Sequence, residues 1–418
     1  MEKIVVEGGY PLEGRVTVSG MKNSALPIIF ATVLVKGECI IHNVPRVSDV
    51  YDSLEILRSI GAYAEFCDAN TLRIDCSDAK NSGFPEGLIG KMRASSYLMG
   101  VMLSRYGRID LPLPGGCNFG ARPLDLHFKG FASLGAECIE KSGRICIFTK
   151  EKLKSNKITL DKISVGATIN MVLASATLEG TTTIVNCAQE PHIDDLICFL
   201  NRCGARIKRC GGTIVCHGVS SLHGSEYTVF PDMIEALTYA CAVGICNGEI
   251  EICGAVLEHL ENELPILRSM GYCIKTYDGI ISFSSSGVNG VCVTTSPYPG
   301  FPTDLHPQFA ALLCFSRGAG AITEEVFPTR FAYVDELQKM GASIVKQHNT
   351  VYIKQSKMRA ASLDATDLRA GAALTIAALG ACGVSTINNV KYIVRGYEDF
   401  VEKIANIGGK IKLIKGEF

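Results

Sequence analysis

The chain has 418 residues, more than one ordinary hydrophobic core organises, so we expect two or three domains. Its 47% hydrophobic and 20% charged residues are typical of a globular protein and exclude a disordered or fibrous one. The 41 basic and 42 acidic residues give a net charge of −1, with no general excess of positive charge for nucleic acid or an anionic membrane. We therefore predict no nucleic-acid partner and no membrane insertion, and any anion site must be local.

The first residues, Met1 to Glu7, mix acids with apolar side chains and do not read as a signal peptide. The longest apolar run, near residues 370–384, is shorter than the roughly 20 residues of a membrane span. A cytoplasmic location follows as the default, and because thiols stay reduced there, we expect the eighteen cysteines to form no disulfide framework. The sequence thus predicts a cytoplasmic protein and leaves its oligomeric state open.

The cysteines also bear on metal binding. No two have Cys-x-x-Cys spacing and the eight histidines are scattered, so we expect no metal site and no other cofactor. Most of these thiols should behave as small buried hydrophobic groups. Five lie in apolar, strand-like runs and should be buried: Cys39, Cys146, Cys216, Cys253 and Cys292.

A short phrase, Leu-x-x-hydrophobic-Gly or a close variant, recurs along the whole chain. Its glycines are Gly61, Gly135, Gly204, Gly271, Gly341 and Gly408, which lie 74, 69, 67, 70 and 67 residues apart. Each copy ends a helical pattern and precedes a strand pattern, where glycine suits the left-handed position that terminates a helix. The spacing predicts six copies of one structural unit.

Each copy also holds a helical segment that is apolar on nearly every side. These segments span residues 24–35, 93–105, 167–178, 232–244, 305–317 and 370–380. Such helices are buried, and a thin solenoid does not cover them on all sides. Packing three copies around three buried helices does, so the residues alone predict two domains of three copies each, with a boundary near 221–231.

One loop carries a candidate reactive thiol. Residues 113–123 read Leu-Pro-Gly-Gly-Cys-Asn-Phe-Gly-Ala-Arg-Pro, which is a loop composition. It holds Cys117, with Arg122 five residues further on, and a nearby cation lowers the pKa of a thiol. The alternative is a buried structural cysteine, and the residues alone leave both interpretations open.

Several buried helices begin with charged or polar residues. The starts are Lys22-Asn23-Ser24, Arg93-Ala94-Ser95, Ser164-Val165-Gly166, Thr303-Asp304 and Asp367-Leu368-Arg369. Free N–H groups and the positive end of the helix dipole favour anions there, although Asp304 and Asp367 are also explained as helix caps or first-turn acids. If these starts converge, they form a cationic cleft for a substrate with several phosphates or carboxylates.

The chain resembles the UDP-N-acetylglucosamine 1-carboxyvinyltransferases, enolpyruvyl transferases of bacterial peptidoglycan synthesis. The motifs that carry the resemblance follow one another along nearly the whole chain, at residues 22–27, 93–95, 114–117, 120–127, 164–168, 301–305, 367–370 and 395–398. The resemblance implies an α/β fold, a two-domain inside-out α/β barrel built from six repeated βαβαββ-type units, three per domain. It also implies that the first strand belongs with the C-terminal half, so that the domains are residues 1–21 with 231–418, and residues 22–230.

The family moves the enolpyruvyl group of phosphoenolpyruvate to the 3-hydroxyl of UDP-N-acetylglucosamine and releases phosphate, the first committed step of peptidoglycan synthesis. The reaction needs an acid that protonates C3 of the enol and a base that takes the hydroxyl proton. By motif match, Cys117 is implied as the acid, as the site of a covalent adduct with phosphoenolpyruvate and as the target of fosfomycin-type inhibitors. Asp304 is implied as the base, and Lys22, Arg122 and Arg395 as the residues that hold the phosphate.

The resemblance also implies further substrate contacts. Arg330 and Arg369 would meet the anion, because guanidinium groups suit phosphate and carboxylate oxygens. The nucleotide sugar would meet Asn23, Arg93, Pro123, Leu124, Asp125, Leu126, Lys162, Ser164, Val165, Gly166 and Val326. In this set the segment 122–126 would bind the uridine and the segment 162–166 the diphosphate.

Departures from the family pattern occur at His192, Met233, Leu237 and Pro328-Thr329. None removes a catalytic residue type, but they bear on hinge behaviour and on the fit around the sugar. Two alternatives follow from the same motifs. One is a sister enolpyruvyl transferase acting on shikimate 3-phosphate, which would lack the Cys117 loop. The other is a non-catalytic paralogue that binds UDP-sugar, against which the intact catalytic set argues.

Overall fold

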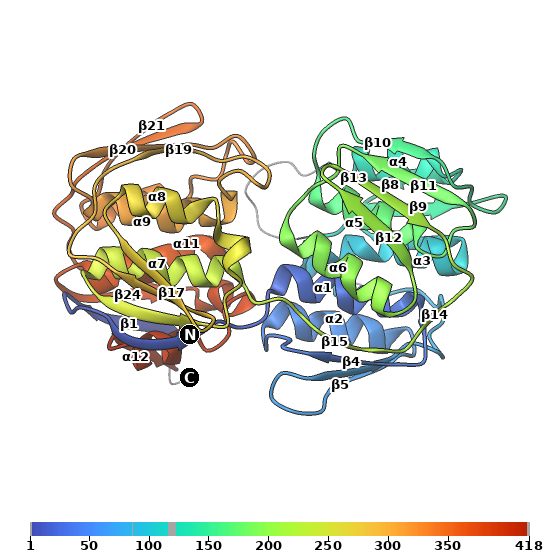
Figure 1. Cartoon of the computed structure of the whole chain (residues 1–418), viewed down its shortest axis with the longest axis horizontal. Coiled ribbons are helices and arrows are strands. Elements are labelled where there is room, and N and C mark those ends of the chain that lie inside the picture. Colours follow the sequence, from blue (N-terminus) through green and yellow to red (C-terminus); the bar gives the residue numbers. More distant parts are fainter. Residues whose placement is uncertain (1, 86, 116–122, 416–418) are drawn as a thin grey trace. The chain divides into compact units, whose positions relative to one another are not determined.

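The computed structural model describes residues 2–85, 87–115 and 123–415. They form two compact units, which we name by their place in the chain (Figure 1). The terminal unit holds residues 2–19 and 231–415, and the central unit holds residues 20–115 and 123–230. The predictions for Cys117 and Arg122 lie outside the described residues.

The central unit alternates helices with short strands. Its helices are α1 (Lys22–Ala31), η1 (Thr32–Leu34), α2 (Ser48–Ser59), η2 (Ile89–Lys91), η3 (Arg93–Tyr97), α3 (Leu98–Tyr106), α4 (Asp125–Ser133), α5 (Val165–Ser175) and α6 (Pro191–Arg202). Its strands are β3 (Val35–Lys36), β4 (Glu38–His42), β5 (Tyr63–Phe66), β6 (Leu72–Asp75), β7 (Arg108–Pro112), β8 (Glu137–Lys141), β9 (Arg144–Phe148), β10 (Lys157–Thr159), β11 (Thr181–Val185), β12 (Arg206–Cys210), β13 (Thr213–His217), β14 (Leu222–His223) and β15 (Glu226–Thr228).

The terminal unit repeats the same alternation. Its helices are α7 (Met233–Cys246), η4 (Leu257–Leu260), α8 (Glu263–Ser269), η5 (Thr303–Leu305), α9 (His306–Phe315), α10 (Tyr333–Lys339), α11 (Leu368–Gly380), η6 (Val390–Arg395) and α12 (Phe400–Asn406). Its strands are β1 (Lys3–Gly8), β2 (Glu13–Thr17), β16 (Glu249–Cys253), β17 (Cys273–Tyr277), β18 (Ile280–Ser284), β19 (Cys292–Thr294), β20 (Ala319–Thr323), β21 (Ser343–Gln347), β22 (Thr350–Lys354), β23 (Ser362–Asp364), β24 (Gly383–Asn388) and β25 (Lys410–Ile414).

Three larger sheets form the outer layer of each unit. The orders are β15-β4-β6-β5, β7-β9-β8 and β10-β11-β13-β12 in the central unit, and β17-β18-β16-β2, β19-β20-β22-β21 and β23-β24-β1-β25 in the terminal unit. The four-stranded sheets share one pattern, in which one edge strand pairs in parallel and the other pairs are antiparallel. The sixth sheet, β7-β9-β8, has only the two antiparallel pairs. Six larger sheets, three in each unit, confirm the six repeated units.

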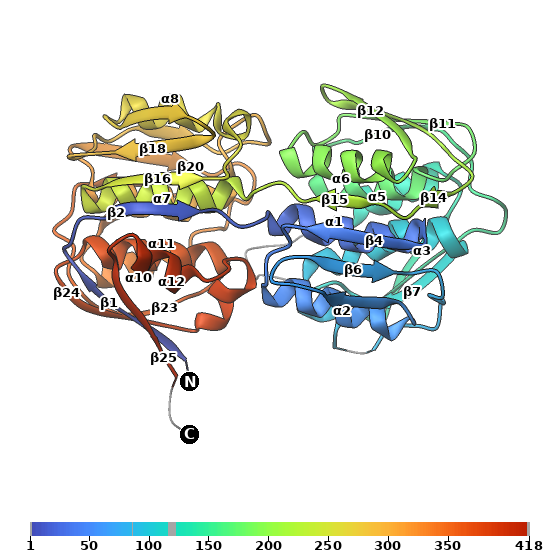
Figure 2. The ribbon, with the colours of Figure 1, turned by 60° about the horizontal axis from the view of Figure 1, so that its bottom comes forward.

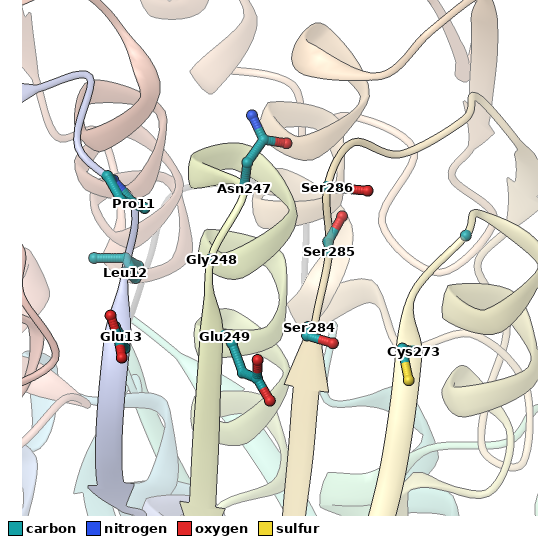
Figure 3. A pocket seen from close by; sticks show the side chains of 11 residues that line it. Pro11, Leu12, Glu13, Asn247, Gly248, Glu249, Cys273, Ser284, Ser285 and Ser286 are labelled. Carbon is teal, nitrogen blue, oxygen red and sulfur yellow. The ribbon is translucent and has the colours of Figure 1, made fainter.

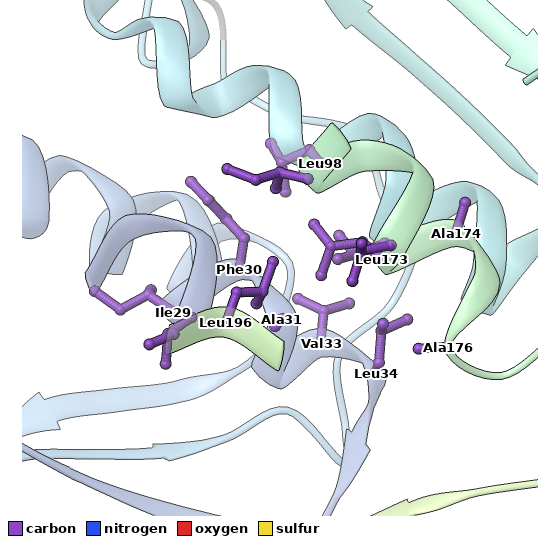
Figure 4. Packing of buried hydrophobic residues seen from close by; sticks show 14 of the residues in the cluster. Ile29, Phe30, Ala31, Val33, Leu34, Leu98, Leu173, Ala174, Ala176 and Leu196 are labelled. Atoms are coloured by element: carbon purple, nitrogen blue, oxygen red, sulfur yellow. The ribbon is translucent and has the colours of Figure 1, made fainter. Parts of the chain in front are cut away.

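The helices between the sheets are the buried ones that the sequence predicts. In the terminal unit α7, α9 and α11 contact one another, and every residue of α7 is buried. In the central unit α3 contacts both α1 and α5. Figure 4 shows Phe30 of α1, Leu98 of α3 and Leu173 of α5 in the core of that unit. With helices inside and strands outside, each unit is an inside-out α/β barrel.

All six repeat glycines follow a helix and have a left-handed backbone. Their φ angles lie between the 89° of Gly408 and the 107° of Gly271, the region that glycine adopts without a steric penalty. They follow α2, α4, α6, α8, α10 and α12 in turn. The prediction that these glycines terminate helices is therefore confirmed.

The N-terminal strand is paired with the C-terminal end of the chain. Strand β1 lies between β24 and β25, antiparallel to both, with Ile4 opposite Ile387 and Leu413 (Figure 2). The chain then passes into the central unit after Ser19 and returns after Phe230. A boundary placed only near 221–231 misses this first crossing, because the partners of β1 lie almost 400 residues away in sequence.

The burial of the strand cysteines is mixed. Cys39 and Cys216 are buried as predicted, but Cys146 and Cys253 are half-buried and Cys292 is exposed. In β19 only the central residue faces inward, so Cys292 takes the solvent side. No helix in the described ranges is both long and apolar enough to cross a bilayer.

A carboxyl group without a partner lies at the start of α8. Glu263 is 1% exposed, and neither of its carboxylate oxygens has a hydrogen-bond partner among the described residues. Burial disfavours the charged form and raises the pKa of Glu263 to about 7. The folded state therefore binds this proton more tightly than the unfolded chain does.

We predict that Glu263→Gln makes the protein more stable at pH 8, by about 1–3 kcal/mol, and changes little at pH 5. The sign follows because a raised pKa contributes stability at low pH that is lost as the pH rises toward 7. Urea unfolding from pH 5 to 8 measures the difference. Glu261→Gln, a change at an exposed position nearby, is the control, and equal pH profiles for both variants would refute the prediction.

Candidate active site

In the terminal unit, Asp304 is joined to two buried arginines. Its Oδ1 accepts a hydrogen bond from Arg330 Nη1 at 2.7 Å, and its Oδ2 accepts from Arg369 Nη2 at 3.2 Å. The arginine side chains are 3% exposed and that of Asp304 is 30% exposed. The carboxylate is therefore held by two fixed cations while part of it remains open to solvent.

Of the two simpler explanations, a helix cap or a first-turn acid, Asp304 fits the second, because it lies in the first turn of η5, and Asp367 fits the first. Asp304 lies in η5, and the N-cap position of α9 is Leu305, which makes no side-chain cap bond. Asp367 accepts from the backbone N–H groups of Arg369 and Ala370 and so caps α11.

Arg369 stays charged although it is buried. Burial alone would lower the pKa of Arg369, but its neighbours Tyr397, Asp304 and Asp232 raise it well above its usual value. Its guanidinium lies over the Tyr397 ring, 5.3 Å from the centroid. Arg369 therefore holds the Asp304 carboxylate as a buried cation.

Arg395 lies near the same end of α11. It is the last residue of η6, which packs against α11. A Cβ atom at Gly396 would come within 2.6 Å of Leu368 Cδ2, so the backbone after Arg395 touches the residue before Arg369. The terminal unit therefore brings Asp304, Arg330, Arg369 and the Arg395 segment together.

In the central unit, Lys22 forms a buried ion pair. Lys22 and Asn23 open α1, and Lys22 Nζ lies 3.1 Å from Asp49 Oδ2 in the first turn of α2. The side chains are 12% and 5% exposed. Sequence analysis missed Asp49, because an acid in the first turn of a helix is already explained by the helix dipole.

The starts of α4 and α5 lie against each other. A Cβ atom at Gly166 would come within 3.1 Å of the His127 ring, and His127 Nδ1 lies 3.0 Å from Asn170 Nδ2. Burial, and then the charge of Arg93, lowers the pKa of His127 to about 3, so the ring is neutral. Arg93 is therefore near this junction, at the beginning of η3.

Most of the remaining predicted residues flank this junction. Ser164 caps α5 through a bond from the Ala167 N–H, and Val165 begins the helix. Around it Pro123, Asp125 and Lys162 are exposed, Leu126 is half-buried, and Leu124 is buried. Val326 belongs to the terminal unit, where its N–H donates to Glu324.

Gly115, the last described residue before Cys117, lies close against the backbone of Gly90. A Cβ atom at Gly115 would lie 1.6 Å from the carbonyl oxygen of Gly90, so only glycine fits there. Gly90 belongs to η2, which comes just before the helix of Arg93. The described chain resumes at Pro123, directly before α4.

Two surface hollows contain none of the predicted residues. Figure 3 shows one of about 550 Å³ in the terminal unit, beside β2, β16 and β18 at the C-terminal end of α7. Another, of about 1020 Å³, lies at the C-terminal ends of α3 and α5. Lys22, Ser164, Asp304 and Arg369 lie instead at or just before the N-terminal ends of α1, α5, α9 and α11. Within the described ranges, no group of three or more His, Cys, Asp or Glu side chains could hold a metal ion.

Known proteins are similar to this chain in sequence and in fold. Residues 6–404 match the family of EPSP synthase (3-phosphoshikimate 1-carboxyvinyltransferase). UDP-N-acetylglucosamine 1-carboxyvinyltransferase 3 of Caldanaerobacter subterraneus is 41% identical over 99% of this chain and 100% of its own length. UDP-N-acetylglucosamine 1-carboxyvinyltransferase 1 of Carboxydothermus hydrogenoformans is 43% identical over 100% of this chain and 99% of its own.

The chain belongs to the UDP-N-acetylglucosamine 1-carboxyvinyltransferase family. The resemblance in the motifs is thereby confirmed. Among solved structures, the enolpyruvyl transferase NikO from Streptomyces tendae has a TM-score of 0.90 at 27% identity, covering 100% of this chain and 99% of its own. EPSP synthase from Acinetobacter baumannii has a TM-score of 0.78 at 18% identity, covering 99% of this chain and 100% of its own, and shares the fold alone. The names of the sequence relatives favour UDP-N-acetylglucosamine 1-carboxyvinyltransferase over the shikimate 3-phosphate alternative.

We predict that Asp49→Asn destabilises the protein by about 1–3 kcal/mol, because it leaves the Lys22 ammonium buried without its carboxylate. Denaturant unfolding measures the loss. The matched control is Asp52→Asn on the same helix, where the partner Lys91 is 49% exposed, and about 0.5 kcal/mol or less is expected. Equal losses of unfolding free energy in the two variants would show that the Lys22–Asp49 pair stabilises the protein no more than an exposed ion pair does.

Proposed function

We propose that this chain transfers the enolpyruvyl group of phosphoenolpyruvate to the 3-hydroxyl of UDP-N-acetylglucosamine and releases phosphate, the first committed step of peptidoglycan synthesis. The observation that carries the proposal is the Asp304 carboxylate held by two buried arginines, in a chain of this family. That arrangement supplies a base and fixed cations at one place, which the reaction requires.

Asp304 is the proposed base. Its carboxylate is partly exposed and can meet a sugar hydroxyl, while Arg330 and Arg369 fix its orientation. Taking the hydroxyl proton lets the oxygen attack C2 of phosphoenolpyruvate. Such positioning of a base is a large part of its catalytic effect.

Cys117 is the proposed acid. Its proton goes to C3 of the enol, which makes C2 electrophilic, and the sugar oxygen then adds to C2 to give a tetrahedral ketal. Return of a proton from the new methyl group and loss of phosphate regenerate the double bond. Lys22, Arg122 and Arg395 are proposed to hold the phosphate, with Arg330 and Arg369 as further anion contacts, because guanidinium groups suit phosphate and carboxylate oxygens.

The nucleotide sugar is proposed to bind mainly to the central unit. Uridine would lie along the segment 122–126 with Asp125 accepting from the base, and the diphosphate would meet Lys162 and the start of α5. The capped start of α5 supports this, because its free N–H groups favour an anion. Asn23, Arg93 and, from the terminal unit, Val326 would contact the sugar.

We also propose which unit carries which catalytic residues, and where in the cell the reaction takes place. The terminal unit would be the domain of the base and the C-terminal arginines, and the central unit the domain of the Cys117 loop. The reaction would run in the cytoplasm and without a cofactor. Every cysteine of the described residues is a free thiol, which fits a reducing compartment.

We predict that phosphate is released only when phosphoenolpyruvate and UDP-N-acetylglucosamine are both present, as a coupled phosphate assay would show. Asp304→Asn should lower kcat about 100-fold or more, because the general base is lost, and should still bind UDP-N-acetylglucosamine. Asp335→Asn, at an exposed position on α10, is the control. Phosphate release with shikimate 3-phosphate instead would support the sister activity, and binding without release would support the non-catalytic alternative.

We predict that fosfomycin adds once, to Cys117, when UDP-N-acetylglucosamine is present. A reactive thiolate opens the epoxide, so the mass of the intact protein should rise by one inhibitor. Six cysteines of the described residues are exposed, namely Cys67, Cys198, Cys210, Cys273, Cys292 and Cys382, so the modified peptide must be mapped. Loss of the adduct in Cys117→Ser is the control, and an adduct at one of these six instead would remove Cys117 from the proposed role.

A further inference from the structure

A second carboxylate lies behind the cluster formed by Asp304, Arg330 and Arg369, and it is wholly buried. Glu324, directly after β20, is 0% exposed. Its Oε1 accepts hydrogen bonds from Thr295 Oγ1 at 2.8 Å and from the N–H groups of Val326 and Phe327 at 2.9 and 2.8 Å. Its Oε2 faces Thr303 Oγ1 at 2.9 Å and His306 Nδ1 at 3.0 Å. Five donors therefore converge on one side chain that does not reach solvent.

The histidine in this group acts as a neutral donor. Burial is the main cause that lowers the pKa of His306, despite the neighbouring carboxylate. An ionised carboxylate only accepts, so the proton of the neutral ring lies on Nδ1, toward Glu324. Nε2 is then the acceptor for the Tyr333 hydroxyl, which lies 2.7 Å away. Burial alone would raise the pKa of Glu324, but the bonds from His306, Phe327 and Thr295 lower it, so Glu324 is ionised.

One hydroxyl connects this carboxylate to Asp304. Thr303 Oγ1 donates to Glu324 Oε2 and accepts from Arg330 Nη1 at 3.1 Å. The same Nη1 reaches Asp304 Oδ1 at 2.7 Å. Glu324 fixes Arg330 by a second route too, because it binds the backbone of Phe327, whose carbonyl accepts from the Arg330 N–H at 2.9 Å.

We propose that Glu324 is a positioning residue for Asp304, acting through Thr303 and Arg330. The inference rests on the proposed function, since it concerns turnover only if Asp304 meets the substrate. Glu324 itself is 0% exposed, so its proposed role is to orient its neighbours and not to contact substrate. Its five donors fix the hydroxyl of Thr303, and through Arg330 they fix the direction in which the Asp304 carboxylate points.

Thr295 offers a matched comparison for Thr303. Each hydroxyl donates to Glu324, at 2.8 and 2.9 Å, but Thr295 also accepts from the Glu325 N–H and has no bond to Arg330 or Asp304. A purely structural role of Glu324 would make the two hydroxyls equivalent for catalysis. A positioning role makes only Thr303 matter for kcat.

The experiment compares Thr303→Val, Thr303→Ser and Thr295→Val in the full chain by steady-state phosphate release and thermal unfolding. We expect Thr303→Val to lower kcat about 10-fold or more, with KM for both substrates within about 3-fold, because orientation and not binding is lost. Thr303→Ser keeps the hydroxyl and should restore most of that loss. Thr295→Val should lower the melting temperature without a comparable change in kcat.

Glu324→Gln completes the test. It should lower kcat in the same way, and adding Thr303→Val should cause little further loss, because residues on one path are not additive. Equal kcat for Thr295→Val and Thr303→Val would overturn the inference, and so would a rise in KM alone, which would make Thr303 a binding residue. Absence of phosphate release by the unaltered chain would instead refute the proposed function, and the inference with it.

Discussion

The bridge from Asp304 to Arg330 and Arg369 places three charges where only 3% of each arginine side chain reaches solvent. Removing a guanidinium from water is costly, and a single carboxylate offsets that cost only when the remaining donors also find partners. Thr303 and the Tyr397 ring supply such contacts, at 3.1 Å to Arg330 and 5.3 Å to Arg369. The geometry of the candidate site is therefore fixed by the requirement to satisfy two buried cations.

That requirement arises from the repeat. Helices α7, α9 and α11 contact one another and are apolar along their length, so charged groups are confined to their ends. Asp367 and Arg369 at the start of α11, and Asp304 just before α9, thus meet at one end of the helix group. In the central unit, the ion pair of Lys22 and Asp49 likewise lies at a helix end, because Lys22 begins α1.

Local features of this chain could be predicted from the sequence, and partners distant in sequence could not. The repeat glycines, such as Gly271 at φ 107°, are readable because the left-handed position depends only on adjacent residues. Cys292 was misjudged, because an apolar run does not reveal which face of a strand a residue takes. Asp49 and Glu324 were missed, since an acid shows its role only once the fold brings Lys22 or Thr303 beside it.

Two carboxylates of the terminal unit, Glu324 and Asp304, show how different surroundings give the same kind of charged group different roles. Glu324 is enclosed by five donors, which favour its charged form and occupy the lone pairs that a substrate hydroxyl would need. Asp304 is held by two arginines yet is 30% exposed, so it can meet a hydroxyl from outside. Enclosure thus suits Glu324 to orienting its neighbours, and partial exposure suits Asp304 to exchanging a proton, although the two are connected through Thr303 and Arg330.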